Sequence, residues 1–561
     1  MPPILECVPN FSDGRNPEIM RQISDRIRSV GGVSLLHVDS GRDTNRTVVT
    51  FAGPPDLIVE AAYQAIAAAT QLIDMRQHRG THPRIGATDV CPLVPISDIS
   101  LEETALHARR LAERVGRELG IPVYLYEAAQ PDPARRDLRT IREGEYEGLA
   151  DKLRRPEWRP DFGPATFNPR SGATVIGARR FLVACNVNLN TTSARRANAV
   201  AFDVREYGRP KREGHPLTGK VVTDSAGKPV MIPGSLKAVK AIGWYLPEYG
   251  VAQVSMNLTD LGTTPLHVAF EEVCRKAEAR GLRVTGSELI GLVPLAAVLE
   301  AGRHFLRKQQ RSVGVSEAEL IKIAVKSLGL DAMGPFKPED RIVEYRLRDA
   351  SLAALRTLSL EGFVDETASE SPAPGGGSVA AAVGALAVAL GTMVANLSAH
   401  KPGWDERWAE FSEWAERGQR LKEALLPLVD EDSRAFAAVL TALSLPKTTP
   451  AEAGIREATL TQATVDSAMV PLKTMRLAVE AFDVLEAMAA EGNPASISDV
   501  GVGALCANAA VRGAWLNVRI NLPGLSDKEL ATSVSAEAQN LAKMAQEKET
   551  RILQRVEEKL R

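Results

Sequence analysis

The chain has 561 residues, of which 44% are apolar and 25% charged, and its formal net charge is −2 at pH 7. These proportions are those of an ordinary soluble globular protein, and a charge so close to zero gives no reason to expect nucleic acid or a membrane surface as a partner. Because a single hydrophobic core rarely grows beyond about 250 to 300 residues, the length predicts three or four compact units.

Residues 1–180 alternate short β-rich runs with amphipathic helical patterns. Alternation of this kind predicts an α/β layer sandwich. The expected strands are 4–9, 33–39, 46–52, 89–96 and 122–128, and the expected helices are 16–30, 55–73 and 101–119.

Residues 181–305 repeat this logic, within a second expected subdomain at 181–345. Their patterns follow the order β-α-β-β-α-β of a ferredoxin-like domain, so we expect two ferredoxin-like α/β sandwich subdomains. The segment 209–236 is rich in Gly, Pro and Lys and looks like an insertion, for which a surface hairpin is favoured over a lid. The expected strands are 181–189, 237–246, 251–258 and 283–292, and the expected helices are 192–207, 265–280 and 295–310.

The character of the chain changes near residue 345, where strand signals disappear. Long helical periodicities predict an all-α helical bundle domain at 353–561, after a short linker at 346–352. The run Ser371–Leu397 has no charged side chain and is long enough to cross a bilayer. It lacks aromatic anchors, so a buried bundle helix is favoured and no membrane span is expected. The expected helices lie near 347–368, 377–398, 405–443, 453–490, 498–518 and 527–559.

The five cysteines are scattered along the sequence and form no closely spaced pair. This distribution favours reduced thiols in a cytoplasmic protein and argues against a zinc framework. The N-terminus has no basic segment before an apolar one, so no signal peptide is expected.

Residues 77–96 contain His78 and His82, two of only eight histidines. Their spacing suggests zinc on a helix face, but Gly80 and Pro83 oppose a helix, and no Glu follows the first His as in a zinc protease. No metal site is therefore expected. His82, fixed by the following proline, is a candidate general acid/base near neutral pH, and a satisfied structural histidine is an equal alternative.

A carboxylate interrupts an apolar stripe in the helix expected at 405–443. Asp430 and Glu431 point away from this stripe and are expected to be solvated. Burial of Asp432 would raise its pKa and make it competent to donate a proton near pH 7, whereas a salt bridge to a neighbouring helix is the structural alternative. The stripe follows steps of three and four residues and consists of Leu425, Val429, Asp432, Phe436, Val439 and Leu443.

Several segments, taken in order, resemble the formimidoyltransferase-cyclodeaminase family, and the resemblance covers nearly the whole chain. It implies a bifunctional folate enzyme of histidine degradation. The α/β part would transfer the formimidoyl group from N-formimidoyl-L-glutamate to tetrahydrofolate. The bundle would then cyclise 5-formimidoyl-tetrahydrofolate to 5,10-methenyl-tetrahydrofolate and release ammonia. The matching segments are Leu5–Ser12, Val38–Gly41, Thr44–Thr47, the motif at 77–96, Trp158–Pro164, Gly172–Val175 and Ala241–Leu246.

For the transferase, the resemblance implies that His82 moves the proton, with His78 in reserve. The family's folate site includes a Gly- and Pro-rich loop in which Phe167 offers a stacking face. The loop residues are Gly163, Pro164, Ala165, Thr166, Phe167, Asn168, Pro169, Arg170, Ser171 and Gly172.

Charged neighbours of this reaction are also expected. A carboxylate near the cationic amidinium would help to hold it, and Asp39 and Asp89 are candidates. Arg46 or Arg84 would pair with substrate carboxylates through bidentate hydrogen bonds. The structural alternatives are a strand-end Asp that caps a turn and an Arg at the sheet edge.

For the cyclodeaminase, the resemblance places the acid/base aspartate at Asp432, which would act without a metal. Gly375, Gly376 and Gly377 precede a helix, so their backbone N–H groups would bind an anion or a pterin oxygen. By resemblance, this triplet belongs to the folate-binding bundle.

The resemblance implies tetrahydrofolate, in polyglutamylated form, as co-substrate, and a homo-oligomer formed through the small-residue helices of the bundle. Two alternatives remain open. One is a glutamate formyltransferase joined to a methenyltetrahydrofolate cyclohydrolase-like bundle, because exchanging NH for O requires only small pocket changes. The other is a non-catalytic folate-binding protein.

Overall fold

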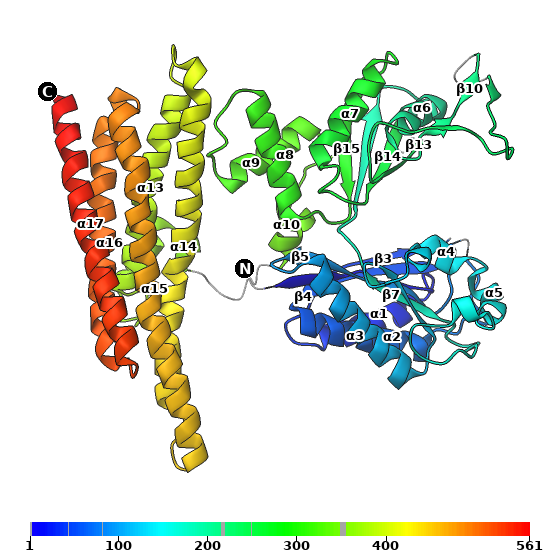
Figure 1. Cartoon of the computed structure of the whole chain (residues 1–561), viewed down its shortest axis with the longest axis horizontal. Coiled ribbons are helices and arrows are strands. Elements are labelled where there is room, and N and C mark those ends of the chain that lie inside the picture. Colours follow the sequence, from blue (N-terminus) through cyan, green and yellow to red (C-terminus); the bar gives the residue numbers. More distant parts are fainter. Residues whose placement is uncertain (1–2, 43, 81, 215–218, 248, 348–354) are drawn as a thin grey trace. The chain divides into compact units, whose positions relative to one another are not determined.

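The structure is a computed structural model that describes residues 3–42, 44–80, 82–214, 219–247, 249–347 and 355–561 (Figure 1). The chain divides into two compact units. Unit 1 is a mixed α/β part with sheets and unit 2 is all helical, which confirms the predicted fold class. Most of the linker predicted at 346–352 lies outside the described residues. Unit 1 comprises Met1–Ala301 and Val325–Arg348, and unit 2 comprises Gly302–Ala324 and Asp349–Arg561.

The first sheet of unit 1 has a ferredoxin-like core. β1 and β2 lie end to end in one strand position, where each pairs with β4 on one side and β5 on the other. β3 pairs with the other edge of β4, and all these pairings are antiparallel. Beyond β5 the sheet continues with β7 and β6 in parallel, and β7 was not predicted. The strands are β1 (Ile4–Cys7), β2 (Asn10–Phe11), β3 (Ser34–Gly41), β4 (Arg46–Gly53), β5 (Thr88–Ser97), β6 (Val123–Glu127) and β7 (Thr174–Ala178).

Three amphipathic helices share a hydrophobic core with one face of this sheet (Figure 1). α1 begins where the Asn16 side chain accepts two backbone N–H groups of the first turn. α3 begins with a capping box of Ser100 and Glu103 and ends at Gly120, where φ is 63°. In the same core the Sγ atoms of Cys7 and Cys91 lie 3.5 Å apart, a contact that sequence spacing did not predict. The helices are α1 (Pro17–Arg28), α2 (Pro55–Leu72) and α3 (Leu101–Leu119).

The segment between β6 and β7 holds short helices that the sequence patterns did not predict. Their length explains the omission, because one or two turns give no measurable periodicity. They are η1 (Pro133–Arg135), α4 (Leu138–Arg142), α5 (Glu145–Lys152) and η2 (Pro156–Trp158).

The second sheet has the strand order β13-β14-β8-β15, all antiparallel, which confirms the second ferredoxin-like arrangement. The insertion forms two short antiparallel pairs, β9 with β12 and β10 with β11, and its residues 215–218 lie outside the described part. The elements are β8 (Val183–Leu189), α6 (Ala194–Val204), β9 (Arg209–Pro210), β10 (Arg212–Glu213), β11 (Lys220–Val221), β12 (Met231–Ile232), β13 (Val239–Leu246), β14 (Val251–Leu258), α7 (Leu266–Glu278) and β15 (Val284–Ile290).

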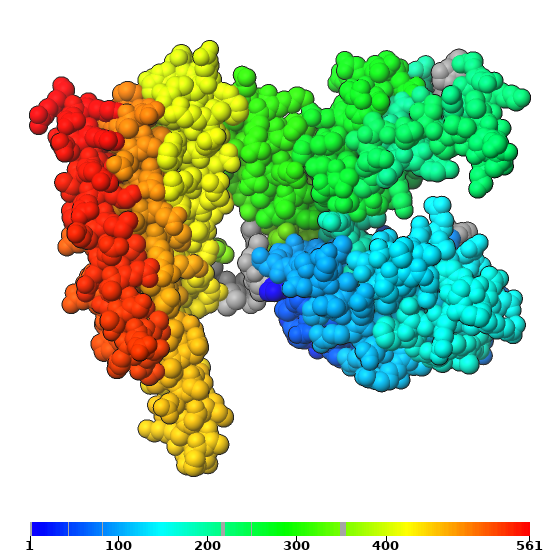
Figure 2. Space-filling view, viewed as in Figure 1, coloured from blue at the N-terminus to red at the C-terminus, as the bar shows by residue number. Residues whose placement is uncertain are grey.

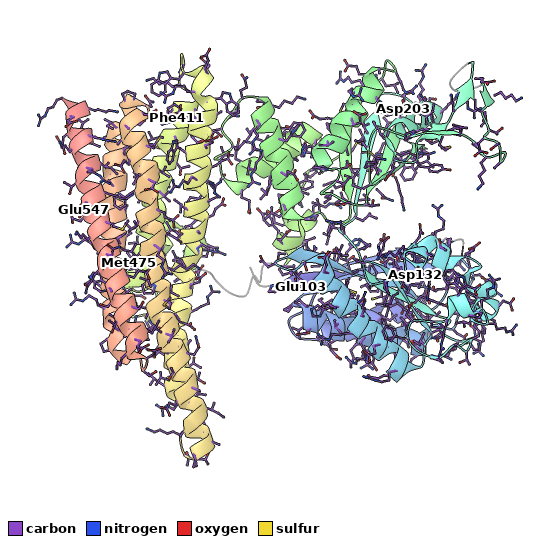
Figure 3. The ribbon with its side chains drawn as sticks, in the orientation of Figure 1. Glu103, Asp132, Asp203, Phe411, Met475 and Glu547 are labelled. Carbon is purple, nitrogen blue, oxygen red and sulfur yellow. The ribbon has the colours of Figure 1, made fainter. Side chains whose placement is uncertain are left out.

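Helices follow β15 to the end of the chain. α13 packs against α14, α15 and α16, and α17 packs against α15 and α16. The core of this bundle includes Phe411 and Met475, both fully buried, whereas Glu547 is exposed on α17 (Figure 3). The helices are α8 (Leu295–Lys308), α9 (Glu317–Leu328), α10 (Pro338–Arg341), α11 (Val343–Arg346), α12 (Leu360–Ala368), α13 (Gly376–Ala399), α14 (Trp408–Ser444), α15 (Pro450–Glu491), α16 (Ile497–Asn521) and α17 (Lys528–Leu560).

Two features of the bundle bear on the predictions. Among the described residues, α13 is the one helix long and apolar enough to cross a membrane, and 61% of its most apolar window is buried, as expected of a core helix. The hairpin of α14 and α15 projects beyond the other helices (Figure 2). Phe436 and Leu443 on this hairpin are 44% and 47% exposed, so the stripe predicted around Asp432 leaves the core beyond that residue.

Candidate functional site

A cavity of about 1010 Å³ lies on the face of the first sheet opposite α1, α2 and α3. Strand side chains alternate between faces. On β4, Val49 and Phe51 are buried in the core shared with these helices, whereas Arg46 and Val48 line the cavity. Its volume is at the upper end of the range of roughly 300–1,000 Å³ typical of small-molecule sites.

Cationic side chains outnumber anionic ones on the cavity wall. Arg139 and Lys240, from the first and second ferredoxin-like subdomains, have no ion pair among the described residues. Such a wall suits a ligand that carries several negative charges. The cationic lining residues are Arg46, Arg136, Arg139, Arg142, Arg179, Arg180 and Lys240, and the anionic ones are Glu127, Asp137, Glu143, Glu145 and Asp260.

His82 lies beside this cavity with both ring nitrogens engaged. Nδ1 is 2.7 Å from the carbonyl oxygen of Pro83, and Nε2 is 2.7 Å from Nη1 of Arg46. A carbonyl only accepts and a guanidinium only donates, so Nδ1 carries the hydrogen and Nε2 presents its lone pair. Burial and the Arg46 charge both lower the pKa of His82 below its ordinary value. His82 is therefore a neutral imidazole in a single tautomer.

Arg46 links His82 to the floor of the sheet. Its Nη2 donates to Oδ1 of Asn10, while its Nε is buried without a hydrogen-bond partner. Burial lowers the pKa of Arg46 to about 10, and the nearby Arg142 acts in the same direction. The predicted anion-binding arginine is thus a poorly solvated cation on the cavity wall.

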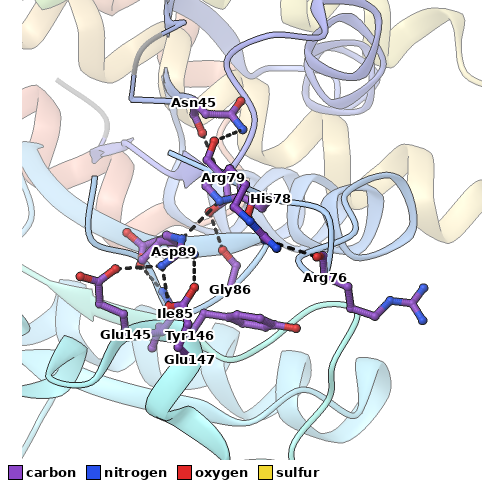
Figure 4. A network of polar contacts seen from close by, with 12 residues as sticks. Asn45, Arg76, His78, Arg79, Ile85, Gly86, Asp89, Glu145, Tyr146 and Glu147 are labelled. Carbon is purple, nitrogen blue, oxygen red and sulfur yellow. Dashed lines mark hydrogen bonds and ion pairs between the residues drawn. The ribbon is translucent and has the colours of Figure 1, made fainter. Parts of the chain in front are cut away.

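His78 and Arg84 serve the loop that carries His82. The Nε2 atom of His78 donates to the carbonyl oxygen of Asn45 at 2.9 Å (Figure 4). Its Nδ1 accepts from Nε of Arg84 at 3.2 Å. Arg84 pairs with Glu145 at 2.8 Å and with Glu147 at 2.6 Å on α5. Both side chains are therefore committed to structure, which was the alternative to their functional roles.

The two candidate carboxylates occupy different environments. Asp89 is buried, accepts the backbone N–H of Ile85 at 3.0 Å and pairs with Arg142 on α4. Asp39 is exposed on β3 and lies opposite Val48 in the β3–β4 register, hence on the cavity face of the sheet. Sequence patterns missed Arg142 because it ends a five-residue helix.

The loop 163–172 packs against the backbone of the His82 loop. Ala87 donates its N–H to the carbonyl of Ser171 at 2.8 Å, and Gly172 faces Gly86 in a β-bridge. The Phe167 ring lies 5.5 Å from that of Tyr146 between centroids. No residue of this loop lines the cavity described above.

Glu6 is a buried carboxylic acid that no sequence pattern singled out. It lies on β1 and is only 4% exposed. Burial raises its pKa to about 7, although the nearby Arg179 opposes this shift and Glu344 adds to it. Leu5 and Cys7 are in the core that the sheet shares with its helices, so Glu6 between them lies on the other face of the sheet. A carboxylate between two apolar residues of a strand is the sequence signal that could have identified it.

In unit 2, Asp432 lies where α14 meets the first turn of α13. Its Oδ2 accepts from the hydroxyl of Ser378 at 3.1 Å, and the Ser378 backbone N–H also bonds to the carboxylate. Burial raises the pKa of Asp432 above its ordinary value, although the bonds from Ser378 oppose this shift. Asp432 is thus a half-buried carboxyl that has no ion pair among the described residues, not a salt-bridged one.

The glycine triplet supplies the space for this carboxylate. A Cβ added at Gly377 would overlap Oδ1 of Asp432, and one added at Gly376 would lie 3.3 Å from Nδ2 of Asn517 on α16. Gly375 caps α13 without a side-chain hydrogen bond. Asn517, which the sequence analysis missed, therefore joins Asp432 and Ser378 around the helix start.

The neighbours of Asp432 differ from their prediction. Asp430 was expected to be solvated, but its side chain is only 14% exposed and lies 3.3 Å from Arg356. Glu431 is partly exposed and lies 3.3 Å from Lys473. The surrounding helices therefore pair both neighbouring carboxylates and leave Asp432 to Ser378.

Among the described residues, no group of three or more His, Cys, Asp or Glu side chains could hold a metal ion.

Comparison with known proteins covers both units. The family model described as the N-terminal subdomain of the formiminotransferase domain matches residues 4–179, and that of the formiminotransferase domain matches 184–348. The model described as formiminotransferase-cyclodeaminase matches 359–540.

Three similar proteins illustrate these matches. The formimidoyltransferase-cyclodeaminase of Mus musculus is 44% identical over 94% of each chain. That of Gallus gallus is 42% identical over 100% of each chain. A methenyltetrahydrofolate cyclohydrolase of Methylorubrum extorquens is 37% identical over 36% of this chain and 97% of its own.

Proposed function

This chain belongs to the formimidoyltransferase-cyclodeaminase family and is a bifunctional folate enzyme of histidine degradation, and we propose that His82 and Asp432 perform its two reactions. The proposal for His82 is carried by its fixed neutral tautomer beside the cavity, in contact with Arg46 of the cavity wall. That for Asp432 is carried by a carboxyl without an ion pair in the described structure at the start of α13. Comparing wild type with substitutions at the two positions, reaction by reaction, tests both.

In the first reaction, N5 of tetrahydrofolate attacks the amidine carbon of N-formimidoyl-glutamate. His82 accepts the proton from N5 through Nε2 and returns it to the nitrogen of the departing glutamate. Its Nδ1–H remains on the Pro83 carbonyl, which holds the ring in one orientation. Arg46 binds a substrate carboxylate, and Asp39 faces the cationic amidine. Loop 163–172 holds the folate.

In the second reaction, N10 closes onto the formimidoyl carbon and ammonia leaves. Asp432 accepts the N10 proton and donates one to the departing nitrogen. Burial raises the pKa of Asp432 above its ordinary value, which makes the carboxylate a better acceptor of the N10 proton, and the acid formed in this way donates to the departing nitrogen. Backbone N–H groups of Gly375, Gly376 and Gly377 hold a polar atom of the folate.

Replacing Gly377 with Ala is expected to lower cyclodeaminase activity at least 10-fold and to leave transferase activity unchanged. The added methyl overlaps Asp432 Oδ1 and displaces the carboxylate. The measurement is ammonia released from 5-formimidoyl-tetrahydrofolate. Gly454→Ala is the control, because nothing lies within 4 Å of a Cβ added there. Equal activity of the two variants would show that the carboxylate does not need this space.

We further propose that the bundle joins copies of this chain. Exposed apolar side chains follow α13 at Leu386 and Leu397 and α16 at Val502 and Leu505. The two helices pack together, so a second copy could cover both rows. Leu386→Asp with Leu505→Asp is expected to reduce the solution mass to that of the 60.4 kDa chain, measured by light scattering. Leu106→Asp, in unit 1, is the control; a monomeric wild type would refute the proposal.

The remaining assignments follow from the same family membership. We assign the transferase to subdomains 1–180 and 181–345, the linker to 346–352 and the cyclodeaminase to 353–561.

Five free cysteines are consistent with a cytoplasmic enzyme. The cationic cavity wall suits a polyglutamylated folate. Because a methenyltetrahydrofolate cyclohydrolase is 37% identical over 36% of this chain, hydrolysis is the second candidate for the bundle, and ammonia release separates the two.

A further inference from the structure

The lone pair that His82 needs as a base is already occupied in this structure. Nη1 of Arg46 lies 2.7 Å from Nε2 of His82, while Nδ1 of the same ring donates to the Pro83 carbonyl. A base that accepts a hydrogen bond from a guanidinium cannot take a proton from a substrate amine until that bond breaks.

Arg46 itself is poorly satisfied where it lies. Its Nη2 donates to Asn10, its Nε is buried without a partner, and it forms no ion pair with a described residue. Asp89, whose negative charge acts on Arg46, already pairs with Arg142. A partly buried cation without a counter-ion gains more from a carboxylate than from a neutral imidazole.

We propose that Arg46 caps the His82 base in the free enzyme and that a carboxylate of the amino-acid substrate removes the cap by drawing the guanidinium away. The inference rests on the proposed role of His82 and adds the event that frees its Nε2 lone pair to act as a base. Binding of the anionic substrate and activation of the base then become one event. When folate is bound without the amino-acid substrate, Arg46 still occupies Nε2 and the imidazole cannot act as a base.

The charges around His82 predict how its titration responds. Arg46 on β4 and Arg142 on α4 oppose protonation of the ring, and Asp89 on β5 favours it. When a substrate carboxylate neutralises Arg46, one opposing charge is lost and the pKa of His82 rises. The acidic limb of kcat, which reports the complex, should therefore lie at higher pH than that of kcat/KM, which reports the free enzyme.

The test uses the full chain and formimidoyl transfer to tetrahydrofolate. In wild type we expect the acidic limb of the kcat pH profile to lie at higher pH than that of the kcat/KM profile. Arg46→Gln should merge them, by raising the limb of kcat/KM, and should raise KM for formimidoyl-glutamate at least 10-fold. Arg46→Lys should restore the separation but only part of the affinity, because Lys lacks the bidentate fork. Arg110→Gln, an exposed arginine on α3, is the control.

Two further measurements separate this inference from loss of structure and from failure of the proposed function. Asn10→Asp gives Arg46 a permanent carboxylate partner. It should therefore raise the pH of the acidic limb of kcat/KM, as Arg46→Gln does, although the guanidinium remains. Adding L-glutamate to the ¹⁵N-histidine-labelled chain should shift the His82 Nε2 resonance, identified with His82→Gln. Unchanged limbs and resonance, with His82→Ala inactive, would overturn the cap alone. A fully active His82→Ala would overturn the function proposed for His82.

Discussion

Replacement of His82 with Ala is expected to lower formimidoyl transfer by roughly 10²- to 10⁴-fold, the usual contribution of a general acid–base group. The neutral ring and its fixed Nδ1 hydrogen bond leave Nε2 as the atom that moves the proton. The measurement is formation of the 5,10-methenyl-tetrahydrofolate absorbance from tetrahydrofolate and N-formimidoyl-glutamate. His37→Ala is the control, because His37 is an exposed histidine of β3.

A second substrate shows whether the loss is confined to the first reaction. Given 5-formimidoyl-tetrahydrofolate, His82→Ala should form the methenyl product at the wild-type rate, because unit 2 then needs no transfer step. If His82→Ala transfers the group normally, the base is a residue other than His82. If it also fails on the intermediate, the substitution has damaged more than the transferase.

The regular elements were predictable because each repeats a pattern over several turns or strand residues. The two β-α-β-β-α-β orders and the long helices of unit 2 are of this kind. The short helices between β6 and β7 were not predictable, because one or two helical turns give too little periodicity. They matter to the site, since Arg142 on α4 holds Asp89 and Glu147 on α5 holds Arg84.

The candidate residues were predictable as types but not as contacts. His82 stood out by its neighbours in sequence, yet its hydrogen bond to Arg46 joins positions 36 apart that only the packed strands bring together. Arg84 and Arg46 looked equivalent in the sequence. Two glutamates from α5 pair with Arg84, whereas Arg46 is left without a carboxylate in the described structure.

Periodicity placed Asp432 on one helix face with Leu425 and Val429, which are buried, but it misjudged what surrounds Asp432. The stripe predicted an apolar neighbourhood on both sides, but the α14–α15 hairpin projects beyond the bundle and exposes Phe436. The predicted alternative, an ion pair, belongs instead to Asp430 and Arg356. A helix pattern fixes which residues share a face, but it does not show where the neighbouring helices end.

Asp432→Asn is expected to abolish most cyclodeaminase activity, by roughly 10²- to 10⁴-fold, while formimidoyl transfer continues. The amide keeps the size of the carboxyl and its bond from the Ser378 N–H, but it cannot exchange a proton with N10. Ammonia release should stop while 5-formimidoyl-tetrahydrofolate accumulates. Asp430→Asn, two residues away on α14, is the control.

The pH dependence of this step follows from the raised pKa of Asp432. Asp432 first accepts the N10 proton, so the ionised carboxylate starts the reaction, and its fraction falls as pH falls through the folded-state pKa; burial raises that pKa and moves this loss of activity to higher pH. Asp432→Glu should therefore retain a pH-dependent rate, whereas the residual rate of Asp432→Asn should lose this dependence. Normal ammonia release by Asp432→Asn would remove the carboxyl from the mechanism. A different result would favour a cyclohydrolase: wild type hydrolyses methenyl-folate and releases no ammonia, and Asp432→Asn abolishes the hydrolysis.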